Sequence, residues 1–475
     1  MARRKHQMVE TRLIAFLLNN LRGGRTGSSR LPPIQAVDPQ AMLETPLATD
    51  VLQPPHSGRP RRGGSLRIAF LSYRSDPRVG GQGVYLFQAA RALAARGHKV
   101  DILSGPPYPD LPPGVELVKI PSLDLYAQPH NGHMALRPRH LLSWTDLAEY
   151  FGHLSGKFME PYTFGRRIAR YLKAHTSDYD VVIDNQSLCY GLLEAQRAGL
   201  PVVGVIHHPI RRDLELALDA EPDPKVRWLI RRWYSFLGMQ EHVAPRLDRV
   251  IVVSKSAGRD VARYLKIAPE RMTAIPIGVD QNIFRPQPDL RRRDRRLLTT
   301  ASADVPLKGL GVLIQAYANL LAAYPDLELV VIGKLKPDGP TGKLLNSLGL
   351  ADRVSFISDL TGEEMAEQYA RATVCVTPSL YEGFGLPAAE AMSCASPVVV
   401  TDGGALPEVV GDAGVVVRRG DPQALATAIA QLLDDPAKRT TLSEASRRRA
   451  REVFSWDRAA AAYETVLEDA VISAC

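Results

Sequence analysis

Short apolar runs rich in β-branched residues alternate with longer amphipathic stretches along most of this chain of 475 residues. The short runs have the length and composition of buried strands, and the stretches between them have the length and periodicity of helices. Strands that alternate with helices predict parallel sheets covered by helices on both faces. We expect strands at residues 66–72, 99–104, 179–183, 201–206, 248–253, 297–301, 327–333, 354–357, 374–377, 397–401 and 415–417.

Polar, proline-bearing segments divide this pattern into parts. Residues 286–296 are highly charged and contain two prolines, which is typical of an interdomain linker. Residues 1–65 are rich in Arg, Pro, Gly and Ser, so we expect a basic and largely disordered extension. The fold class is therefore α/β, with two doubly wound Rossmann-like domains at residues 66–285 and 297–454 that face a cleft. A final helix over residues 455–475 is expected to pack back toward the first domain.

Composition and charge narrow the class of protein. Hydrophobic residues make up 45% of the chain and charged residues 23%, as in soluble globular proteins. The formal net charge is +8, but residues 1–65 hold ten Lys and Arg against four Asp and Glu. The rest of the chain is near neutral and gives no case for nucleic-acid binding. Because no apolar run is long enough to span a bilayer and the four cysteines form no CxxC pair, we expect a cytoplasmic protein with free thiols.

The most informative stretch runs from Ser379 to Met392. Two carboxylates, Glu382 and Glu390, stand eight positions apart, with a Gly-Phe-Gly-Leu-Pro turn between them and a buried strand just before. A strand, a glycine turn and a helix in this order point backbone N–H groups and a helix N-terminus at an anion. The amides predicted to bind the anion are those of Gly383, Phe384, Gly385 and Leu386.

The run from Pro378 to Val400 resembles the signature of retaining GT-B glycosyltransferases of the family 4 type, in which seven residues separate two glutamates. The resemblance covers about residue 66 to the C-terminus. It implies a metal-independent hexosyltransferase-type enzyme without a cofactor, which moves a sugar from a nucleoside diphosphate sugar to an acceptor hydroxyl. Further pieces match in order: Val252–Ser254, Val279–Asp280, Phe284, Pro286, Lys308–Gly309, Pro407–Glu408 and Phe454–Trp456.

The resemblance also implies roles for residues of the second domain. The glycine-turn amides would hold the distal phosphate of the donor, and Lys308 would place a positive charge on the leaving diphosphate. Glu390 would accept hydrogen bonds from the ribose hydroxyls, and Glu382 would bind donor-sugar hydroxyls or orient the site. The alternative is that both glutamates lie on a solvated helix face, which the preceding strand and glycine turn argue against.

In the first domain, His207 follows a predicted strand and so lies at its carboxyl end. The resemblance implies that His207 contacts the donor sugar near the anomeric carbon, whereas a lone histidine is more commonly a satisfied core residue. The loop with Gly81 and Gly83 would border the donor phosphate and the acceptor. The residues expected on the acceptor side are Asn185, His208 and Arg211, although Asn185 also fits an ordinary loop.

One departure from the family pattern concerns an arginine that usually precedes the Lys-Gly pair. Ser302 and Ala303 stand there instead, and Lys334 is a candidate replacement. The Asp178–Asp180 pair spells a DxD pattern, but it precedes a strand and is interpreted as a turn, and no cluster has metal-ligand spacing. We therefore predict no metal requirement.

The sequence predicts only broad classes for the acceptor and for the partners of the protein. The acceptor is expected to be a glycan, a lipid-linked molecule or a small molecule. A helix at Val226–Gly238, with Arg227 and Arg231 beside its apolar stripe, would dock on a membrane or a lipid-linked acceptor, whereas a packed core helix with ordinary surface arginines is the simpler explanation of the pattern. A basic helix at Val9–Leu21 would also contact lipid, unless it is a frayed tail.

Two other functions fit the fold, namely a GT-B sugar-nucleotide epimerase and a non-catalytic sugar-nucleotide-binding protein.

Overall fold

The computed structural model describes residues 64–75, 81–126, 136–219, 221–290, 292–301 and 304–474. The predictions made for residues 1–63 lie outside these described residues. Contacts between Cα atoms divide the chain into two compact units that interleave along the sequence. Unit 1 comprises Met1–Ile251, Val261–Thr273 and Glu464–Cys475, and unit 2 comprises Val252–Asp260 and Ala274–Tyr463. The continuous domain limits at residues 66–285, 297–454 and 455–475 stay predictions.

A seven-stranded sheet with the order β3-β2-β1-β4-β5-β6-β7 forms the centre of unit 1. The pairs from β3 through β5 are parallel. Every residue of β4 and β5 is buried, as expected for central parallel strands covered on both faces. The strands are β1 (Arg67–Ser72), β2 (Lys99–Ser104), β3 (Val115–Lys119), β4 (Val181–Asn185), β5 (Val202–Ile206), β6 (Arg249–Val252) and β7 (Met272–Ala274).

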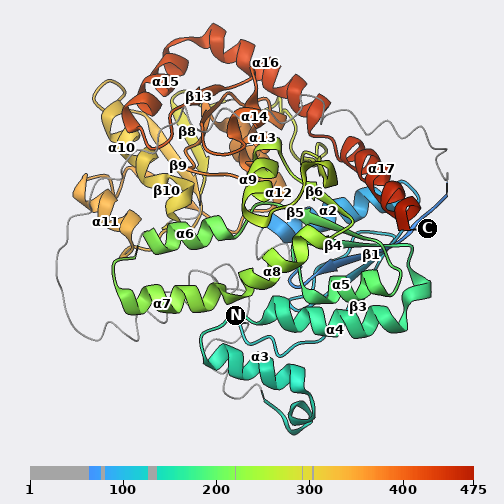
Figure 1. Cartoon of the computed structure of the whole chain (residues 1–475). Helices are drawn as coiled ribbons and strands as arrows, with labels where there is room; N and C mark the ends of the chain where they lie inside the picture. Colours follow the sequence, from blue (N-terminus) through green and yellow to red (C-terminus); the bar gives the residue numbers. More distant parts are fainter. Residues whose placement is uncertain are drawn as a thin grey trace. The chain divides into compact units, whose positions relative to one another are not determined.

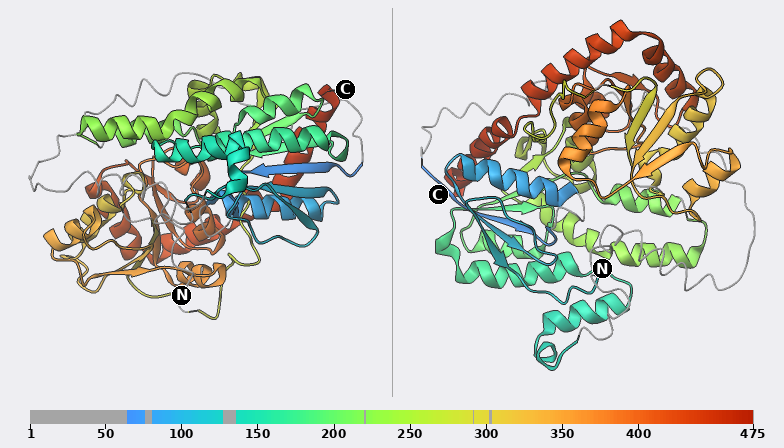
Figure 2. Two further views of the ribbon diagram at one scale, coloured as in Figure 1. Left: turned by 90° about the horizontal axis from the view of Figure 1, so that it is seen from below. Right: turned by 180° about the vertical axis from the view of Figure 1, so that it is seen from behind.

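Helices cover both faces of this sheet, as the turned views in Figure 2 show for α2 on one side and α4 on the other. α4 packs on α5 at Gly165 and Gly191, where a Cβ on Gly191 would come within 2.2 Å of the Gly165 carbonyl oxygen. The helices are α2 (Gly81–Ala95), α3 (Trp144–Leu154), α4 (Glu160–Ala174), α5 (Tyr190–Arg197), α6 (Arg211–Asp219), α7 (Pro224–Trp233) and α8 (Leu237–Val243). Two more helices, α9 (Lys255–Leu265) and α17 (Trp456–Ala474), have residues in both units.

Unit 2 is built on a six-stranded sheet with the order β10-β9-β8-β11-β12-β13, in which all neighbouring strands are parallel. α10 packs on α15, and α13 packs on α12 and α16 (Figure 1). The strands are β8 (Arg296–Thr300), β9 (Glu328–Ile332), β10 (Val354–Ile357), β11 (Val374–Thr377), β12 (Val398–Thr401) and β13 (Val415–Val417). The helices are α10 (Leu310–Leu320), α11 (Pro340–Ser347), α12 (Gly362–Arg371), α13 (Leu386–Ser393), α14 (Leu406–Val410), α15 (Pro422–Asp434) and α16 (Pro436–Val453).

Each sheet has one point at which the strand order reverses, between β1 and β4 in unit 1 and between β8 and β11 in unit 2. At such a point the loops after the two strands lead to opposite faces of the sheet, which leaves a crevice outside their carboxyl ends. The prediction of two doubly wound α/β sheets is confirmed. Ligand-binding residues are therefore expected in the loops that follow these four strands.

The structure corrects the prediction of one continuous helix over Val226–Gly238. α7 ends at Trp233, a single 3-10 turn covers Tyr234–Phe236, and α8 then begins at Leu237. The turn brings the side chains of Trp233 and Leu237 into a buried cluster of largely aromatic residues, so the packed-core explanation of this segment is confirmed. Among the described residues, no helix is both long and apolar enough to cross a membrane.

Candidate functional site

Lys308 and Glu382 lie side by side at the switch point of unit 2. Lys308 ends the turn after β8, Glu382 lies in the loop after β11, and Lys308 Nζ is 2.7 Å from Glu382 Oε1. Ser379 Oγ donates to the same carboxylate oxygen at 2.8 Å. The Glu382 side chain is 13% exposed and the Lys308 side chain 33%. The carboxylate therefore holds the ammonium group in place while leaving it accessible to an anion.

Two glycines permit this close approach of loops. Gly309 has φ +62°, and a Cβ there would come within 1.9 Å of the Pro378 carbonyl oxygen. Gly404, in the loop after β12, has φ +66°, and a Cβ there would come within 2.2 Å of the Glu382 carbonyl oxygen. Any larger side chain at either position would separate the loops, because the obstructing atoms belong to the backbone.

The glycine turn after β11 leads directly into α13. Gly385 caps this helix in the left-handed conformation, with φ +102°. Within the described part of the chain, no hydrogen bond is donated by the amides of residues 383–386. Ser254 Oγ donates to the Gly383 carbonyl oxygen at 2.7 Å and so fixes one peptide of the turn. Free amides at the positive end of a helix dipole are suited to bind an anion, so the anion site expected at this turn stays a prediction.

Glu390 lies one turn further along α13 and has a very different environment from Glu382. Its carboxylate is buried and accepts a hydrogen bond of 3.0 Å from the Tyr369 hydroxyl, which in turn lies 3.1 Å from Thr300 Oγ1. Burial raises the pKa of Glu390 to about 8, although the Tyr369 hydrogen bond acts in the opposite direction. Hydroxyl groups of a ligand that donate to Glu390 would favour its charged form.

His207 lies at the carboxyl end of β5, in unit 1. Its Nε2 is 2.8 Å from Asn185 Oδ1, and Gln186 Oε1 accepts from the His207 backbone N–H at 2.7 Å. Asn185 Nδ2 donates to the Gln82 carbonyl oxygen at 3.3 Å, which identifies Oδ1 as the acceptor for the imidazole. The ring of Tyr85 meets the imidazole edge-on at 4.6 Å. These contacts assign the proton to Nε2 and leave the Nδ1 lone pair for a ligand.

Burial lowers the pKa of His207 to about 3, and the neighbouring charge of His208 acts in the same direction. The imidazole is therefore neutral at physiological pH. It can take part in hydrogen bonds there, but it does not supply a positive charge.

A buried carboxylate shapes the loop that carries Asn185. Asp184 accepts from the Leu188 amide at 2.8 Å and from Ser187 Oγ, while Gln186 and Leu188 both have positive φ. Burial raises the pKa of Asp184 to about 6 against the effect of these hydrogen bonds. The sequence indicated Asp184, Asn185 and Gln186 together, because they form a polar run at the end of an apolar strand. It did not indicate that Asp184 would be buried and shape the loop, or that Gln186 would hold the His207 backbone.

Several predicted residues are engaged elsewhere within their own unit. The pairs are Lys334 with Asp359 at 2.8 Å, His208 with Asp213 at 2.9 Å, and Arg211 with Glu241 at 3.1 Å. Gly81 and Gly83 lie in the first turn of α2, where Gly83 is buried. Gly80 and the Ser302–Ala303 segment lie outside the described residues. The roles assigned to all of these residues stay predictions.

The carboxylates of the DxD pattern have structural partners. Asp180 accepts hydrogen bonds from the Arg67 guanidinium and the Arg67 backbone N–H, and Asp178 ends a 3-10 turn. Among the described residues, no three or more His, Cys, Asp or Glu side chains are grouped so that they could hold a metal ion.

Two family models together cover most of the chain. The model described as "Glycosyltransferase Family 4" matches residues 79–282, and the model described as "Glycosyl transferases group 1" matches residues 282–449. The two matches meet at residue 282, so His207 lies within the first match and Glu382 lies within the second.

Curated relatives match over nearly their whole length. The MMP alpha-(1->4)-mannosyltransferase of Mycolicibacterium hassiacum is 43% identical over 420 residues, which cover 86% of this chain and 100% of that protein. The D-inositol 3-phosphate glycosyltransferase of Thermobispora bispora is 32% identical over 439 residues, which cover 85% of this chain and 95% of that protein.

Solved structures share the fold at lower identity. Sucrose-phosphate synthase from Thermosynechococcus elongatus matches with a TM-score of 0.61 and 24% identity, over 83% of this chain and 96% of that one. HepE from Anabaena, solved in complex with UDP and glucose, matches with a TM-score of 0.60 and 19% identity, over 83% of this chain and 97% of that one. The two-domain GT-B architecture is confirmed by these matches.

Proposed function

The chain belongs to the family 4 glycosyltransferases, and on that premise we propose that it transfers a sugar from a nucleoside diphosphate donor to an acceptor hydroxyl with retention of configuration. The observation that carries this proposal is the switch point of unit 2. There, Lys308 and four free amides of residues 383–386 converge at the carboxyl ends of β8 and β11. A donor diphosphate has the charge and the acceptor oxygens that such an arrangement binds.

In this proposal, unit 2 stabilises the leaving group. Negative charge grows on the distal phosphate as the glycosidic bond breaks, and the Lys308 ammonium with the turn amides stabilises it. The Gly309–Pro378 contact holds the Lys308 turn against the next loop, so little reorganisation is needed. Because these groups supply the charge stabilisation themselves, we propose a transfer step that needs no metal ion.

The geometry favours transfer on one face of the sugar. Glu382, the carboxylate beside Lys308, is engaged by the ammonium and by Ser379 Oγ, so it is poorly placed to act as a covalent nucleophile. We infer that the departing diphosphate takes the proton of the attacking hydroxyl on the same face, which keeps the anomeric configuration. His207 contributes a neutral imidazole whose Nδ1 accepts a hydroxyl hydrogen bond.

The donor sugar is proposed to be mannose, because the 43% identical relative is named a mannosyltransferase. The acceptor is a glycan or a small hydroxyl compound in the first instance. A lipid-linked acceptor is supported by the exposed side chains of α3, since Trp144 and Phe151 are 69% and 61% exposed. Arg137 and Arg139 stand next to this apolar surface and suit an anionic membrane. Failure of the protein to co-sediment with anionic vesicles would remove the membrane contact from the proposal.

The test begins with donor binding and then isolates Lys308. GDP-, UDP- and ADP-sugars are compared by thermal shift, because a ligand that binds only the folded protein raises its melting temperature. We expect Lys308→Gln to lower kcat by about 10²–10³-fold with EDTA present throughout, as for loss of one preorganised charge-stabilising donor. The control is Lys343→Gln, which removes an exposed lysine on α11 of the same unit.

Four results would contradict the proposal. No thermal shift with any nucleotide sugar would argue against a donor site. A donor shift without transfer would indicate a binding protein, and conversion of the free nucleotide sugar to its epimer would indicate an epimerase. An inverted product, seen in the anomeric proton coupling by NMR, would contradict retention.

A further inference from the structure

The side chain of Asn185, at the carboxyl end of β4, has a partner at both ends of its amide. Nδ2 donates to the Gln82 carbonyl oxygen in the first turn of α2, and Oδ1 accepts from His207 Nε2. Asn185 has no exposed surface. The sequence predicted Asn185 on the acceptor side, but a buried amide with two protein partners has no surface with which to contact an acceptor. Its effect on a substrate would therefore pass through His207.

The direction of these two hydrogen bonds determines which nitrogen of His207 carries the proton. A carbonyl oxygen only accepts, so the contact with Gln82 requires the NH2 end of the Asn185 amide to face α2. The Oδ1 end then faces the imidazole, and Nε2 must donate to it. A neutral imidazole carries one ring proton, so Nδ1 is left as an acceptor. Within the described residues Nδ1 has no hydrogen-bond partner, and His207 is partly exposed.

Gln186 holds the backbone of the same histidine. Its side-chain Oε1 accepts from the His207 N–H at 2.7 Å, and its Nε2 donates to the His208 carbonyl oxygen at 2.6 Å. β4 and β5 pair as far as Asn185 and Val205, after which Gln186 turns away with φ +56°. The Gln186 side chain thus replaces the neighbouring strand as the partner of the backbone beyond β5. Together, the side chains of Asn185 and Gln186 form an amide clamp on His207.

Other buried groups fix the loop that carries the amide clamp. Asp184 accepts from the Leu188 N–H and from Ser187 Oγ, and Gln240 Nε2 donates to the Ser187 carbonyl oxygen at 3.4 Å. Asp184, Gln186 and Ser187 are each at most 1% exposed. Left-handed backbone at a residue other than glycine persists only where the surrounding contacts hold it, and such residues cluster at functional sites. The loop therefore presents the clamp in one fixed conformation.

We propose that Asn185 and Gln186 are positioning residues that keep His207 as a hydrogen-bond acceptor, so that the site selects a sugar hydroxyl over groups that cannot donate. A hydroxyl gives its hydrogen to Nδ1, whereas fluorine or a methoxy group has no hydrogen to give. A ligand of that kind removes water from Nδ1 without replacing its hydrogen bond, which weakens binding. The inference rests on the proposed function, because it concerns the substrates of that same reaction.

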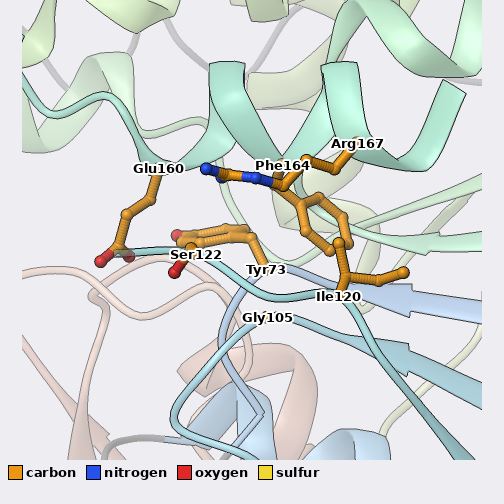
Figure 3. A pocket seen from close by; sticks show the side chains of 7 residues that line it. All are labelled: Tyr73, Gly105, Ile120, Ser122, Glu160, Phe164 and Arg167. Atoms are coloured by element: carbon orange, nitrogen blue, oxygen red, sulfur yellow. The ribbon is translucent and has the colours of Figure 1, made fainter. Parts of the chain in front are cut away.

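A different polar pocket of unit 1, around Glu160, offers no comparable group to a substrate (Figure 3). Arg74 Nε is 3.2 Å from Glu160 Oε2, and Arg167 Nη1 is 2.6 Å from Glu149 Oε2, so the charged groups pair with one another. The pocket beside them has room for about one water molecule. Of these two polar sites in unit 1, the one at His207 therefore has the acceptor that a ligand can reach.

The first experiment reads the tautomer of His207 in the wild-type protein. When the histidines are isotope-labelled, the NMR signals of the two ring nitrogens show which of them carries the proton, and His207→Gln identifies the signals of His207. We expect the proton on Nε2 in the wild type and a mixture of both tautomers in Asn185→Leu. A proton on Nδ1 in the wild type would overturn the proposal.

The second experiment measures the selectivity that this tautomer imposes. One series is the nucleoside diphosphate mannose that shifts the melting temperature, with analogues in which fluorine replaces one hydroxyl. The other is methyl α-mannoside with its fluorinated analogues. Affinity is measured because fluorine near the reacting carbon slows transfer by itself. We expect the wild type to bind at least one analogue about tenfold more weakly than its parent, as for the loss of one hydrogen bond.

The variant Asn185→Leu separates this effect from a structural one. At the position read by His207, the difference between hydroxyl and fluorine should fall to about twofold, while the differences at the other positions stay unchanged. The series in which this happens shows whether the hydroxyl belongs to the donor or to the acceptor. An equal loss of affinity for parents and all analogues would indicate a structural role and contradict the proposal.

Gln186 is tested by a variant that leaves the tautomer unchanged. Gln186→Met removes both hydrogen bonds to the backbone but keeps the Asn185 contact, so we expect kcat to fall about tenfold while the proton stays on Nε2. The matched control is Gln196→Met, which removes a side-chain hydrogen bond from α5 to the Arg246 carbonyl oxygen and should leave kcat unchanged. A wild-type kcat in folded Gln186→Met would contradict the role of Gln186.

The clamp and the proposed function fail in different ways. If no nucleotide sugar shifts the melting temperature, the proposed function fails, whereas the NMR measurement still tests the clamp in the free protein. If Asn185→Leu does not fold, the wild-type tautomer and Gln186→Met decide the matter. Donor binding and transfer by a protein whose His207 carries its proton on Nδ1 would contradict the clamp alone.

Discussion

The two glutamates of one short motif illustrate how strongly environment decides the chemistry of a side chain. Glu382 is held by Lys308 and Ser379 near the surface, whereas Glu390 is buried against Tyr369. Their spacing in the sequence predicted that both are site residues. Only the structure separates an ion-paired carboxylate from one whose pKa burial raises to about 8.

This difference predicts a pH dependence of stability. Because the pKa of Glu390 is raised above its value in the unfolded chain, near 4.5, the folded state binds more protons between these values. The contribution of Glu390 to stability is complete below about pH 4.5 and is lost as the pH rises through about 8. We expect Glu390→Gln to flatten the dependence of the unfolding free energy on pH over this range, measured by urea denaturation.

The control for this effect is Glu444→Gln, which changes an exposed carboxylate on α16. It should leave the wild-type slope intact. A slope that survives Glu390→Gln would assign the pH dependence to other buried carboxyl groups and contradict the raised pKa. Affinity for nucleoside diphosphates provides an independent readout, because the proposed role of Glu390 as a ribose ligand predicts that its loss weakens this affinity.

The candidate site residues were easier to predict from the sequence than the residues that hold them in place. The spacing of Glu382 and Glu390, the glycine turn and Lys308 were all visible in the sequence. Tyr369, which bonds Glu390, comes from another helix, and Gln186, which holds His207, lies in the loop after a different strand. These contacts depend on which strands become neighbours, and no local pattern encodes that. The exposed ion pair of Lys334 with Asp359 was missed for the same reason.

At the scale of elements, hydrophobic runs predicted the central strands well because those strands are buried on both faces. β3 was missed because polar residues interrupt its apolar ones at the edge of the sheet, and β7 because its three residues, Met-Thr-Ala, form no apolar β-branched run. The break between α7 and α8 was invisible because its residues, Tyr234, Ser235 and Phe236, include no Gly or Pro that would indicate the end of a helix. The position of the break depends instead on the packing of Trp233 into the buried cluster of largely aromatic residues.

Glycine positions give a sharp prediction at this scale. Gly309 and Gly349 both have positive φ, +62° and +67°, but only at Gly309 would a Cβ meet backbone. We expect Gly309→Ala to cost about 2–4 kcal/mol, because the clash with Pro378 adds to the left-handed strain. Gly349→Ala, with open space around its Cβ, should cost about 1 kcal/mol. Urea denaturation measures both.

The same pair of variants separates stability from function. Gly309→Ala should also lower kcat, since the displaced turn carries Lys308. Gly349→Ala should leave kcat unchanged. If both variants lose the same stability, the approach of the Gly309 turn to Pro378 is not tight in solution.

At the scale of the whole molecule, each unit places its candidate site residues by the same feature, a reversal of strand order between two central strands. The alternation of strands and helices predicted this arrangement, and the ordered family motifs identified the loops. The order of strands in each sheet could not be read from local pattern, because it depends on the crossover connections.

The C-terminal segment provides the last prediction, because residues 464–474 of α17 belong to unit 1 although the preceding residues belong to unit 2. Leu467 is fully buried there, and Glu464 and Asp469 pair with Arg96 and Arg249 of unit 1. Leu467→Ala should therefore destabilise the protein by about 2–5 kcal/mol, as for other buried leucines. Its neighbour Glu468→Ala is the control, with an expected loss below about 0.5 kcal/mol. Since the proposed donor site lies in unit 2, nucleoside diphosphate affinity measured by calorimetry below the melting transition should remain unchanged in Leu467→Ala. A weakened affinity would show that α17 transmits its packing in unit 1 to the donor site.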